Sequence, residues 1–279
     1  MPQTPEDGRS PIERDGFSYL PRFFTAAEGD ELIRYFGELM PIWEKRHQKD
    51  EHGRAAGHSR RLTRPVYWLG AWQFACLGYY AEPDYREDRC LRAEALPEVM
   101  HTILERLRPT LREHDEAIDG TVRGLPNSCL INYYGRELSE GPPRDYARLR
   151  MHRDSEPGPV VIFSIGQPAL IEFLDPDLSE TPELSVWGRH RSVTIFSGPE
   201  YKDRLYHRVT KVRTGKIPTI DTRLSNFDVR RVSVSFRHIP EDLISEFDGL
   251  SEGSRAQVRG YVEELAEHSP HFREQLARG

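Results

Sequence analysis

The chain has 279 residues, of which 37% are hydrophobic and 30% charged, and its formal net charge is -6. This composition predicts a globular protein with a sizeable core and excludes a uniformly basic nucleic-acid binder, but not a local basic patch. No apolar run approaches the roughly 18 residues that a membrane span needs, and the N-terminus lacks a signal-peptide pattern. The three widely spaced cysteines form neither a zinc pattern nor an obvious disulfide framework, so we expect a cytoplasmic protein.

The N-terminal part, residues 16–122, is predicted to be a helical region that also supplies a substrate lid. Before it, residues 1–15 are polar and proline-rich, and we expect them to be disordered. Residues 23–46 predict a helix, because Thr25 and Glu28 have the spacing of a capping box and apolar residues then recur at helical spacing.

Three further segments complete this region. Residues 48–64 form a polar stretch that predicts a loop. Residues 65–80 are apolar and rich in aromatic side chains, which favours strand and turn. Residues 96–117 predict a second helix around Pro109.

The pattern changes between residues 123 and 240, where short runs of β-branched and aromatic residues alternate with glycine and proline. Many short strands separated by turns are typical of a β-sandwich or a β-barrel. Residues 241–279 return to a helical pattern and are predicted to form a C-terminal helical tail.

A candidate metal site lies in this β-rich part. His152 and Asp154 are two residues apart, so on a strand both side chains face the same way, although a chance surface pair would have the same spacing. With a second histidine they would form the 2-His-1-carboxylate triad that leaves positions on Fe(II) open. His207 lies 53 residues after Asp154 and follows an apolar run, whereas His190 lies at a possible hairpin end. We favour His207 and keep His190 as the alternative.

A candidate anion site lies on the last strand of the core. Arg231 and Arg237 are six residues apart, so they face the same side as Ser233 and Ser235. Two inward-facing arginines are costly without an anion, and the guanidinium fork suits a carboxylate. The same alternation also occurs on solvent-facing edge strands, so the spacing alone leaves both possibilities open.

Taken together, the order and spacing of these motifs resemble the AlkB-like Fe(II)/2-oxoglutarate dioxygenases. The similar segments lie between about residues 125 and 238 and contain an Asn-x-Tyr pair, the His-x-Asp pair, the later histidine and the Arg-x-Ser-x-Ser-x-Arg strand. The resemblance implies an α+β, mainly β fold: a double-stranded β-helix, or jelly roll, at residues 123–240 with N-terminal helices and a helical tail.

Carried over residue by residue, the resemblance implies a role for each motif. The iron ligands, which form the catalytic centre, would be His152, Asp154 and His207. The residues that bind 2-oxoglutarate would be Asn132, Tyr134, Arg231, Ser233 and Arg237. Arg231 would pair with the distal carboxylate of 2-oxoglutarate, and Arg237 would lie near its keto-acid end. Ser233 and Ser235 depart from the family's usual asparagine and threonine, and the segment before His152 is longer than expected.

The resemblance also implies the chemistry. With Fe(II) and O2, 2-oxoglutarate is converted to succinate and CO2 while one oxygen atom hydroxylates a C–H bond. We expect oxidative demethylation of N-alkylated bases in DNA or RNA, with release of formaldehyde. The alternatives are the same chemistry on a protein side chain or small metabolite, and a non-catalytic jelly-roll binding module. A zinc hydrolase would leave the two arginines without a role.

Two basic stretches could bind phosphates. Residues 42–64 have a net charge of +4, and residues 202–216 lie next to His207 and contain one acidic residue. The candidate substrate residues, including aromatic side chains that could stack on a base, are Arg60, Arg61, Tyr67, Trp68, Trp72 and Tyr80. The alternative remains that the aromatic side chains lie in the core and that the cations are solvated on the surface.

Overall fold

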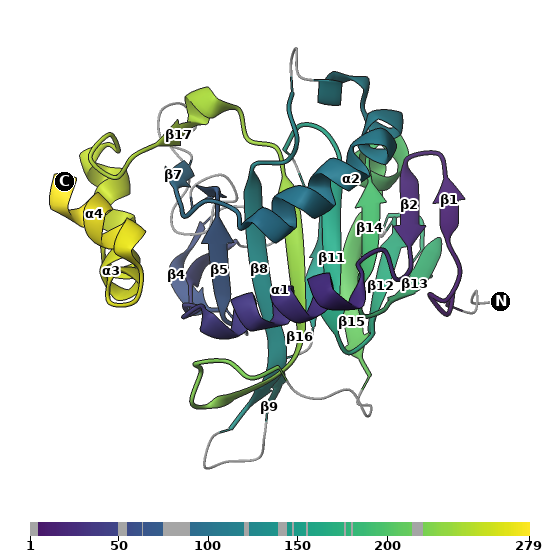
Figure 1. Cartoon of the computed structure of the whole chain (residues 1–279), viewed down its shortest axis with the longest axis horizontal. Coiled ribbons are helices and arrows are strands. Elements are labelled where there is room, and N and C mark those ends of the chain that lie inside the picture. Colours follow the sequence, from purple (N-terminus) through teal and green to yellow (C-terminus); the bar gives the residue numbers. More distant parts are fainter. Residues whose placement is uncertain are drawn as a thin grey trace.

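The computed structural model describes most of the chain, namely residues 5–49, 55–62, 64–74, 90–119, 123–138, 144–146, 148–154, 156–175, 177–179, 181–213 and 220–279. Its centre is a pair of antiparallel sheets, of eight and four strands (Figure 1). None of the helices in these described ranges is long and apolar enough to cross a membrane.

The eight-stranded sheet has the order β1-β2-β14-β11-β16-β8-β5, and β9 pairs with β8. Its strands, in chain order, are β1 (Ile12–Arg14), β2 (Phe17–Leu20), β5 (Val66–Leu69), β8 (Ser128–Glu137), β9 (Arg144–Tyr146), β11 (Val160–Gly166), β14 (Ser192–Phe196) and β16 (Phe227–Arg237). The four-stranded sheet has the order β10-β15-β12-β13. Its strands are β10 (Leu149–His152), β12 (Ala169–Leu174), β13 (Leu184–Gly188) and β15 (Tyr206–Val212).

Two smaller sheets lie outside this pair. They consist of β6 (Ala71–Trp72), β7 (Cys90–Arg92) and β17 (Ile244–Ser245), and of the hairpin β3 (Lys45–Lys49) and β4 (Ala55–Arg61). The α-helices are α1 (Ala26–Glu38), α2 (Glu98–His114), α3 (Glu252–Ala266) and α4 (Pro270–Arg278). Single turns lie at η1 (Glu116–Asp119), η2 (Pro199–Arg204) and η3 (Glu241–Leu243).

Side-chain alternation on β11 explains how the layers pack. Val161 and Phe163 face a core shared with α1 and α2, whereas Val160 and Ile162 face a second core shared with β12 and β15. The strand is therefore apolar on both faces, as a central strand must be. Helices α1 and α2 cross the outer face of the large sheet (Figure 1). The expectation of a mainly β jelly roll with flanking helices is confirmed.

The predicted start of α1 is also confirmed. The side chain of Thr25 accepts from the amide of Glu28, and Glu28 accepts from the amide of Thr25, so both bonds of the capping box are present. The second predicted helix corresponds to α2, which contains Pro109 as expected. Both helices are shorter than the predicted segments.

Three N-terminal expectations differ from the structure. Residues 1–15 were expected to be disordered, but Glu6 bonds to the backbone of β13 and residues 12–14 form β1, because these backbone groups complete sheet edges. Residues 48–64 were expected to be a loop, but most of the described residues there form the β3–β4 hairpin. Residues 16–122 contain α1 and α2, but they also contain strands of the large sheet, because β2 pairs with β14 and β5 pairs with β8.

Candidate metal centre and co-substrate cavity

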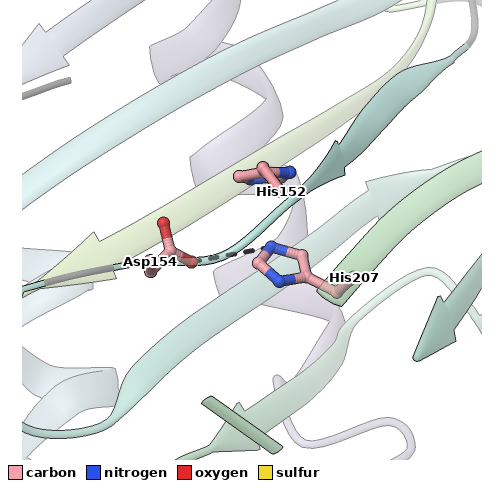
Figure 2. Close-up of side chains that lie close together, drawn as sticks. All are labelled: His152, Asp154 and His207. Atoms are coloured by element: carbon pink, nitrogen blue, oxygen red, sulfur yellow. Dashed lines mark ion pairs between the residues drawn. The ribbon is translucent and has the colours of Figure 1, made fainter. Parts of the chain in front are cut away.

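The three predicted metal ligands meet at the β10 edge of the four-stranded sheet. His152 ends β10 and is the direct cross-strand partner of His207 on β15. Their ring centres are 4.1 Å apart, and Nε2 of His207 lies 3.5 Å from Oδ2 of Asp154 (Figure 2). One ligand atom from each residue lies within 4.8 Å of the others. The antiparallel register therefore assembles two imidazoles and one carboxylate, as the spacing predicted.

The hydrogen bonds of these side chains leave atoms free for a metal. Nδ1 of His152 lies 2.9 Å from the carbonyl oxygen of Arg150, which places the proton on Nδ1 and the lone pair on Nε2. Oδ2 of Asp154 is buried and has no hydrogen-bond partner among the described residues. A buried acceptor without a partner is costly, and a cation bound between the three side chains would satisfy it. The residues therefore fit a divalent metal.

The protonation states also suit a metal. Burial lowers the pKa of His207 to about 3, helped by the nearby His152, and burial lowers the pKa of His152. Burial alone would raise the pKa of Asp154, but Arg237 and the two histidines hold it well below its usual range. At neutral pH the site offers two neutral imidazoles and one carboxylate, which is the form that binds metal.

A cavity of about 290 Å³ opens beside the two histidines. Every residue predicted to bind 2-oxoglutarate lines it: Asn132, Tyr134, Arg231, Ser233 and Arg237. Ser235 lines it as well. Asn132 on β8 and Ser233 on β16 are cross-strand partners, as are Tyr134 and Arg231. The strand register thus brings the two predicted motifs to one wall of the cavity.

Arg231 is a buried cation without a carboxylate partner in the described part of the chain. It is 1% exposed; Nη1 donates to the carbonyls of Gln167 and Gly188 and Nη2 to Oγ of Ser164. Burial lowers its pKa to about 10, so it stays charged at neutral pH. A buried, unneutralised guanidinium is unfavourable until an anion pairs with it. Arg231 could therefore hold a carboxylate at the inner end of the cavity.

Two further residues, which no sequence motif pointed to, belong to the site. Arg64 is buried, lines the cavity, and donates from Nε to Oδ1 of Asn132 at 2.7 Å. Glu156 is buried, and Oε2 lies 3.6 Å from Nε of Arg237. Burial raises the pKa of Glu156. The spacing of Glu156, two residues after Asp154, was the sequence feature that could have identified it.

The alternative ligand His190 does not take part. Its Nδ1 accepts a hydrogen bond from the amide of Gly166 at 3.1 Å, so it closes a turn instead. The predicted base-stacking aromatics Tyr67, Trp68 and Trp72 are also corrected. All three are buried in the core that α1 and α2 share with the large sheet, and they do not line the cavity.

The two basic stretches differ in how their charges are paired. In the first stretch, residues 42–64, Arg61 is exposed and bonds Glu137 at 3.0 Å. The side chain of Arg60, and Tyr80 as a whole, lie outside the described residues.

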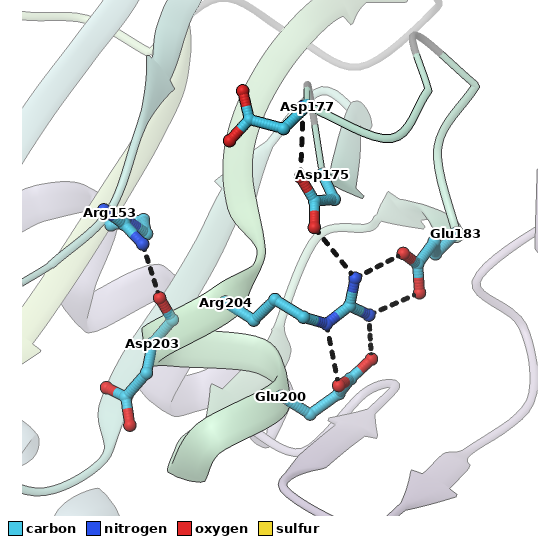
Figure 3. A network of polar contacts seen from close by, with 7 residues as sticks. All are labelled: Arg153, Asp175, Asp177, Glu183, Glu200, Asp203 and Arg204. Atoms are coloured by element: carbon cyan, nitrogen blue, oxygen red, sulfur yellow. Dashed lines mark hydrogen bonds and ion pairs between the residues drawn. The ribbon is translucent and has the colours of Figure 1, made fainter.

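Three cations of the basic stretch 202–216 already have partners within the protein. Arg204 bonds Asp175, Glu183 and Glu200 (Figure 3). Arg208 pairs with Glu172 at 2.8 Å, and Lys202 is buried with its ammonium on two backbone carbonyls. These three side chains already have partners, so they do not bind phosphates as predicted. For the remaining cations of the stretch the prediction stays a prediction, and residues 214–216 lie outside the described residues.

A triad of two histidines and one carboxylate, beside a cavity that contains an unpaired arginine, defines a non-haem iron oxygenase site. The sequence model of the 2OG-Fe(II) oxygenase superfamily matches residues 16–237, and the chain belongs to that superfamily. The protein is therefore an Fe(II)- and 2-oxoglutarate-dependent dioxygenase that uses O2.

Two similar solved structures were found, and the first supports the fold. A structure titled "The structure of OsALKBH1" is similar with a TM-score of 0.52 and 20% identity, covering 81% of this chain and 99% of that one. A 2OG-Fe(II) oxygenase family oxidoreductase from Burkholderia pseudomallei has a TM-score of 0.44 and 17% identity, covering 80% and 85%. No curated protein matches the chain significantly. The first similarity agrees with an AlkB-like fold.

Proposed function

We propose that this dioxygenase demethylates N-alkylated bases of DNA or RNA. The observation that carries the proposal is a row of arginines beside the metal ligands. Arg148, Arg150 and Arg153 are exposed on and beside β10, and Arg150 and Arg153 line the cavity. None of the three has an ion pair with a described carboxylate. Unneutralised cations at the mouth of the cavity suit a phosphate backbone.

Arg153 is held in place for such a contact. Its guanidinium lies 4.5 Å from the ring centre of Tyr206, and Nη1 donates to the carbonyl of Asp203 at 2.6 Å (Figure 3). This bond and the stacking fix the side chain without neutralising its charge. An arginine fixed in this way loses little conformational entropy when it binds an anion.

The size of the cavity limits what can reach the metal. About 290 Å³ is near the lower end of the range for small-molecule sites. It suits a co-substrate and one planar base better than a folded segment of a macromolecule. A base in a duplex would have to leave the stack to enter, so single-stranded nucleic acid is the favoured substrate form.

The residues of the cavity have distinct proposed roles. We assign the distal carboxylate of 2-oxoglutarate to Arg231 and its keto-acid end to the neighbourhood of Arg237. Asn132, oriented by Arg64, and Tyr134 would hydrogen-bond the co-substrate. Iron held by the triad would supply the oxidising power, while the protein supplies ligand geometry, anion pairing and exclusion of water. Hydroxylation of an N-methyl group then releases formaldehyde and the free amine.

The second candidate is the same oxidation of a protein side chain or small metabolite. The overall charge of -6 favours it, because a net negative charge disfavours association with a nucleic acid. We also propose a cytoplasmic location, supported by the free, buried thiol of Cys129.

Charge reversal at the mouth of the cavity tests the proposal. The double variant Arg150→Glu/Arg153→Glu should raise the KM for an N-methylated single-stranded oligonucleotide at least tenfold and flatten its salt dependence. Substrate-independent succinate formation should change little. Arg34→Glu, an exposed position on α1, is the matched control. An unchanged KM in the double variant would contradict phosphate binding at this surface.

A further inference from the structure

The three metal ligands are held in place in two different ways. His152 and His207 lie on paired strands, and the register of β10 and β15 sets their separation. Asp154 lies outside the strands, in the link that joins β10 to β11. Strand pairing does not fix the backbone of Asp154, so other contacts have to hold the carboxylate ligand beside the two histidines.

The link from β10 to β11 bends sharply after Asp154. Gly158 has a φ of 80°, in the left-handed region that favours glycine. A Cβ at this position would lie 3.2 Å from Nη1 of Arg123 and 3.2 Å from Oδ2 of Asp115, which form an ion pair with each other. The ion pair closes one side of the bend, and the conformation of the link is therefore tightly determined.

A single buried lysine bonds the backbone of the link. Nζ of Lys202 donates to the carbonyl oxygens of Glu156 and Gly158. Lys202 is 7% exposed, so its ammonium is largely removed from water. Hydrogen bonds from a charged donor are stronger than those between neutral groups, and a buried site strengthens them further. Lys202 thus fixes the backbone two and four residues after Asp154.

Lys202 lies on a firmly anchored turn. In the same turn, η2, the ring of Tyr201 packs in the second core with its centre 5.1 Å from that of Phe17. On the other side of Lys202, Arg204 bonds three carboxylates (Figure 3). The turn leads directly into β15, which contains His207. Lys202 therefore connects the link that contains Asp154 to a fixed point near the second histidine ligand.

A second cavity adjoins Lys202. Its volume is about 350 Å³, and its lining includes Asp154, Glu156 and Lys202. No described residue lines both this cavity and the co-substrate cavity. Water in the second cavity could bond the carbonyls of the link if the ammonium were absent, but it would not hold them at a fixed place. The cavity also leaves room for a longer side chain at position 202.

We propose that Lys202 positions Asp154 for metal binding by holding the link that follows it. Arg237 orients the carboxylate of Asp154, whereas Lys202 determines where its backbone lies. Lys202 is a positioning residue, because it bonds the link and does not line the co-substrate cavity. The inference rests on the metal-binding triad and is independent of which substrate the enzyme oxidises.

Co(II) binding to the metal-free protein tests this role. Lys202→Met keeps most of the side-chain volume and removes both hydrogen bonds. We expect the Kd for Co(II) to rise about tenfold or more, the usual effect of losing a contact that orients a metal ligand. Lys211→Met removes an exposed ammonium from the strand of His207 and is the matched control. Its Kd should stay within a factor of about 2 of the wild-type value.

The conservative variant separates the two hydrogen bonds from simple packing. Lys202→Arg keeps a charged donor for both carbonyls, and the adjoining cavity accommodates the larger guanidinium. Its Kd for Co(II) should stay within about threefold of the wild-type value. A loss of affinity as large as that of Lys202→Met would overturn the proposal, because the bonds would then not be what matters.

Two further results would also overturn the positioning. One is a Co(II) Kd of folded Lys202→Met within about twofold of the wild-type value. The other is an equal rise of the Kd in Lys211→Met, which would show a general effect of lost charge. Thermal unfolding of the metal-free proteins shows whether each variant is folded. If Lys202→Met is unfolded, Lys202→Gln removes the charge with a polar side chain, and the same limits apply to it.

Discussion

Arg237 donates two hydrogen bonds to a single oxygen of Asp154, from Nε at 2.9 Å and from Nη2 at 2.7 Å. Oδ1 is thereby fully used, and Oδ2 remains for the metal, 3.5 Å from His207. The arginine that lines the co-substrate cavity also orients a metal ligand. Metal binding and 2-oxoglutarate binding are therefore expected to depend on each other.

The first prediction concerns this pair. Arg237→Gln leaves a buried carboxylate without its cation, which costs about 3 to 5 kcal/mol of folding stability. In the wild type, the low pKa of Asp154 stabilises the fold above the carboxyl's unfolded pKa, and this stabilisation is lost as pH falls through the folded pKa. In the variant, acid unfolding should begin at higher pH and Co(II) affinity should fall. Thermal unfolding between pH 3 and 7 and Co(II) titration measure both, and unchanged values would contradict the role of Arg237.

The second prediction concerns metal removal. Bound metal at a hundredfold excess over Kd adds about 2.7 kcal/mol of stability. We expect Mn(II) or Co(II) to raise the Tm, EDTA to reverse the rise, and His207→Ala or Asp154→Ala to abolish it with little change of fold. His152→Ala should likewise abolish succinate formation. Full turnover in any of these variants would show that the metal is bound elsewhere.

The third prediction is a pH dependence. The pKa of His207 is lowered to about 3, below its value in the unfolded chain, so its contribution to stability is complete above about pH 6.5. Below that pH the unfolded chain takes up a proton that the folded site does not, and stability falls progressively toward pH 3. Metal affinity should change little between pH 8 and 6. A steep loss of Co(II) binding near pH 6.5 would indicate a histidine with an ordinary pKa.

The fourth prediction separates co-substrate binding from metal binding. Arg231→Lys keeps a charge but loses the planar fork, so the KM for 2-oxoglutarate should rise about tenfold or more. Co(II) affinity should stay within a factor of about 2, because Arg231 does not touch the triad. The neighbouring Arg230→Lys is the control, since that side chain lies near Asp228 and does not line the cavity. Equal KM values for the two variants would remove Arg231 from the co-substrate site.

The fifth prediction concerns the fold alone. Thr25→Ala breaks the capping box of α1 and should cost about 1 kcal/mol without changing turnover. Thr102→Ala, at an exposed position of α2, should change stability by less than about 0.5 kcal/mol. Urea unfolding of the two variants gives the difference, and equal midpoints would contradict the stabilising role of the cap.

The site could be predicted where its residues follow the period of a strand. The spacings of His152 and Asp154, and of Arg231, Ser233 and Arg237, fix a common face whatever the tertiary structure. To assign His207 as the third ligand, the order of the strands was needed as well. Its antiparallel pairing with β10 brings it opposite His152. Local spacing and a simple strand order were therefore enough to predict the three residues of the metal centre.

Other features depend on long-range partners that local patterns do not contain. Two of the acids that neutralise Arg204 are distant in sequence: Asp175 lies just past the end of β12 and Glu183 just before β13, so its charge looked available in the sequence. Trp68 and Trp72 are aromatic residues near a basic stretch, yet their indoles bond the buried Glu44. The β3–β4 hairpin lacks a clear alternation of apolar and polar residues, and its pairing could not be foreseen.

Simultaneous quantification of succinate and formaldehyde tests whether the protein demethylates nucleic acid. The protein is supplied with Fe(II), ascorbate, 2-oxoglutarate and an N-methylated single-stranded oligonucleotide. We predict that the two products rise in a ratio of about one to one and that both vanish in His207→Ala, since each hydroxylated methyl consumes one 2-oxoglutarate. Succinate without formaldehyde would contradict demethylation of nucleic acid and leave a dioxygenase with another substrate.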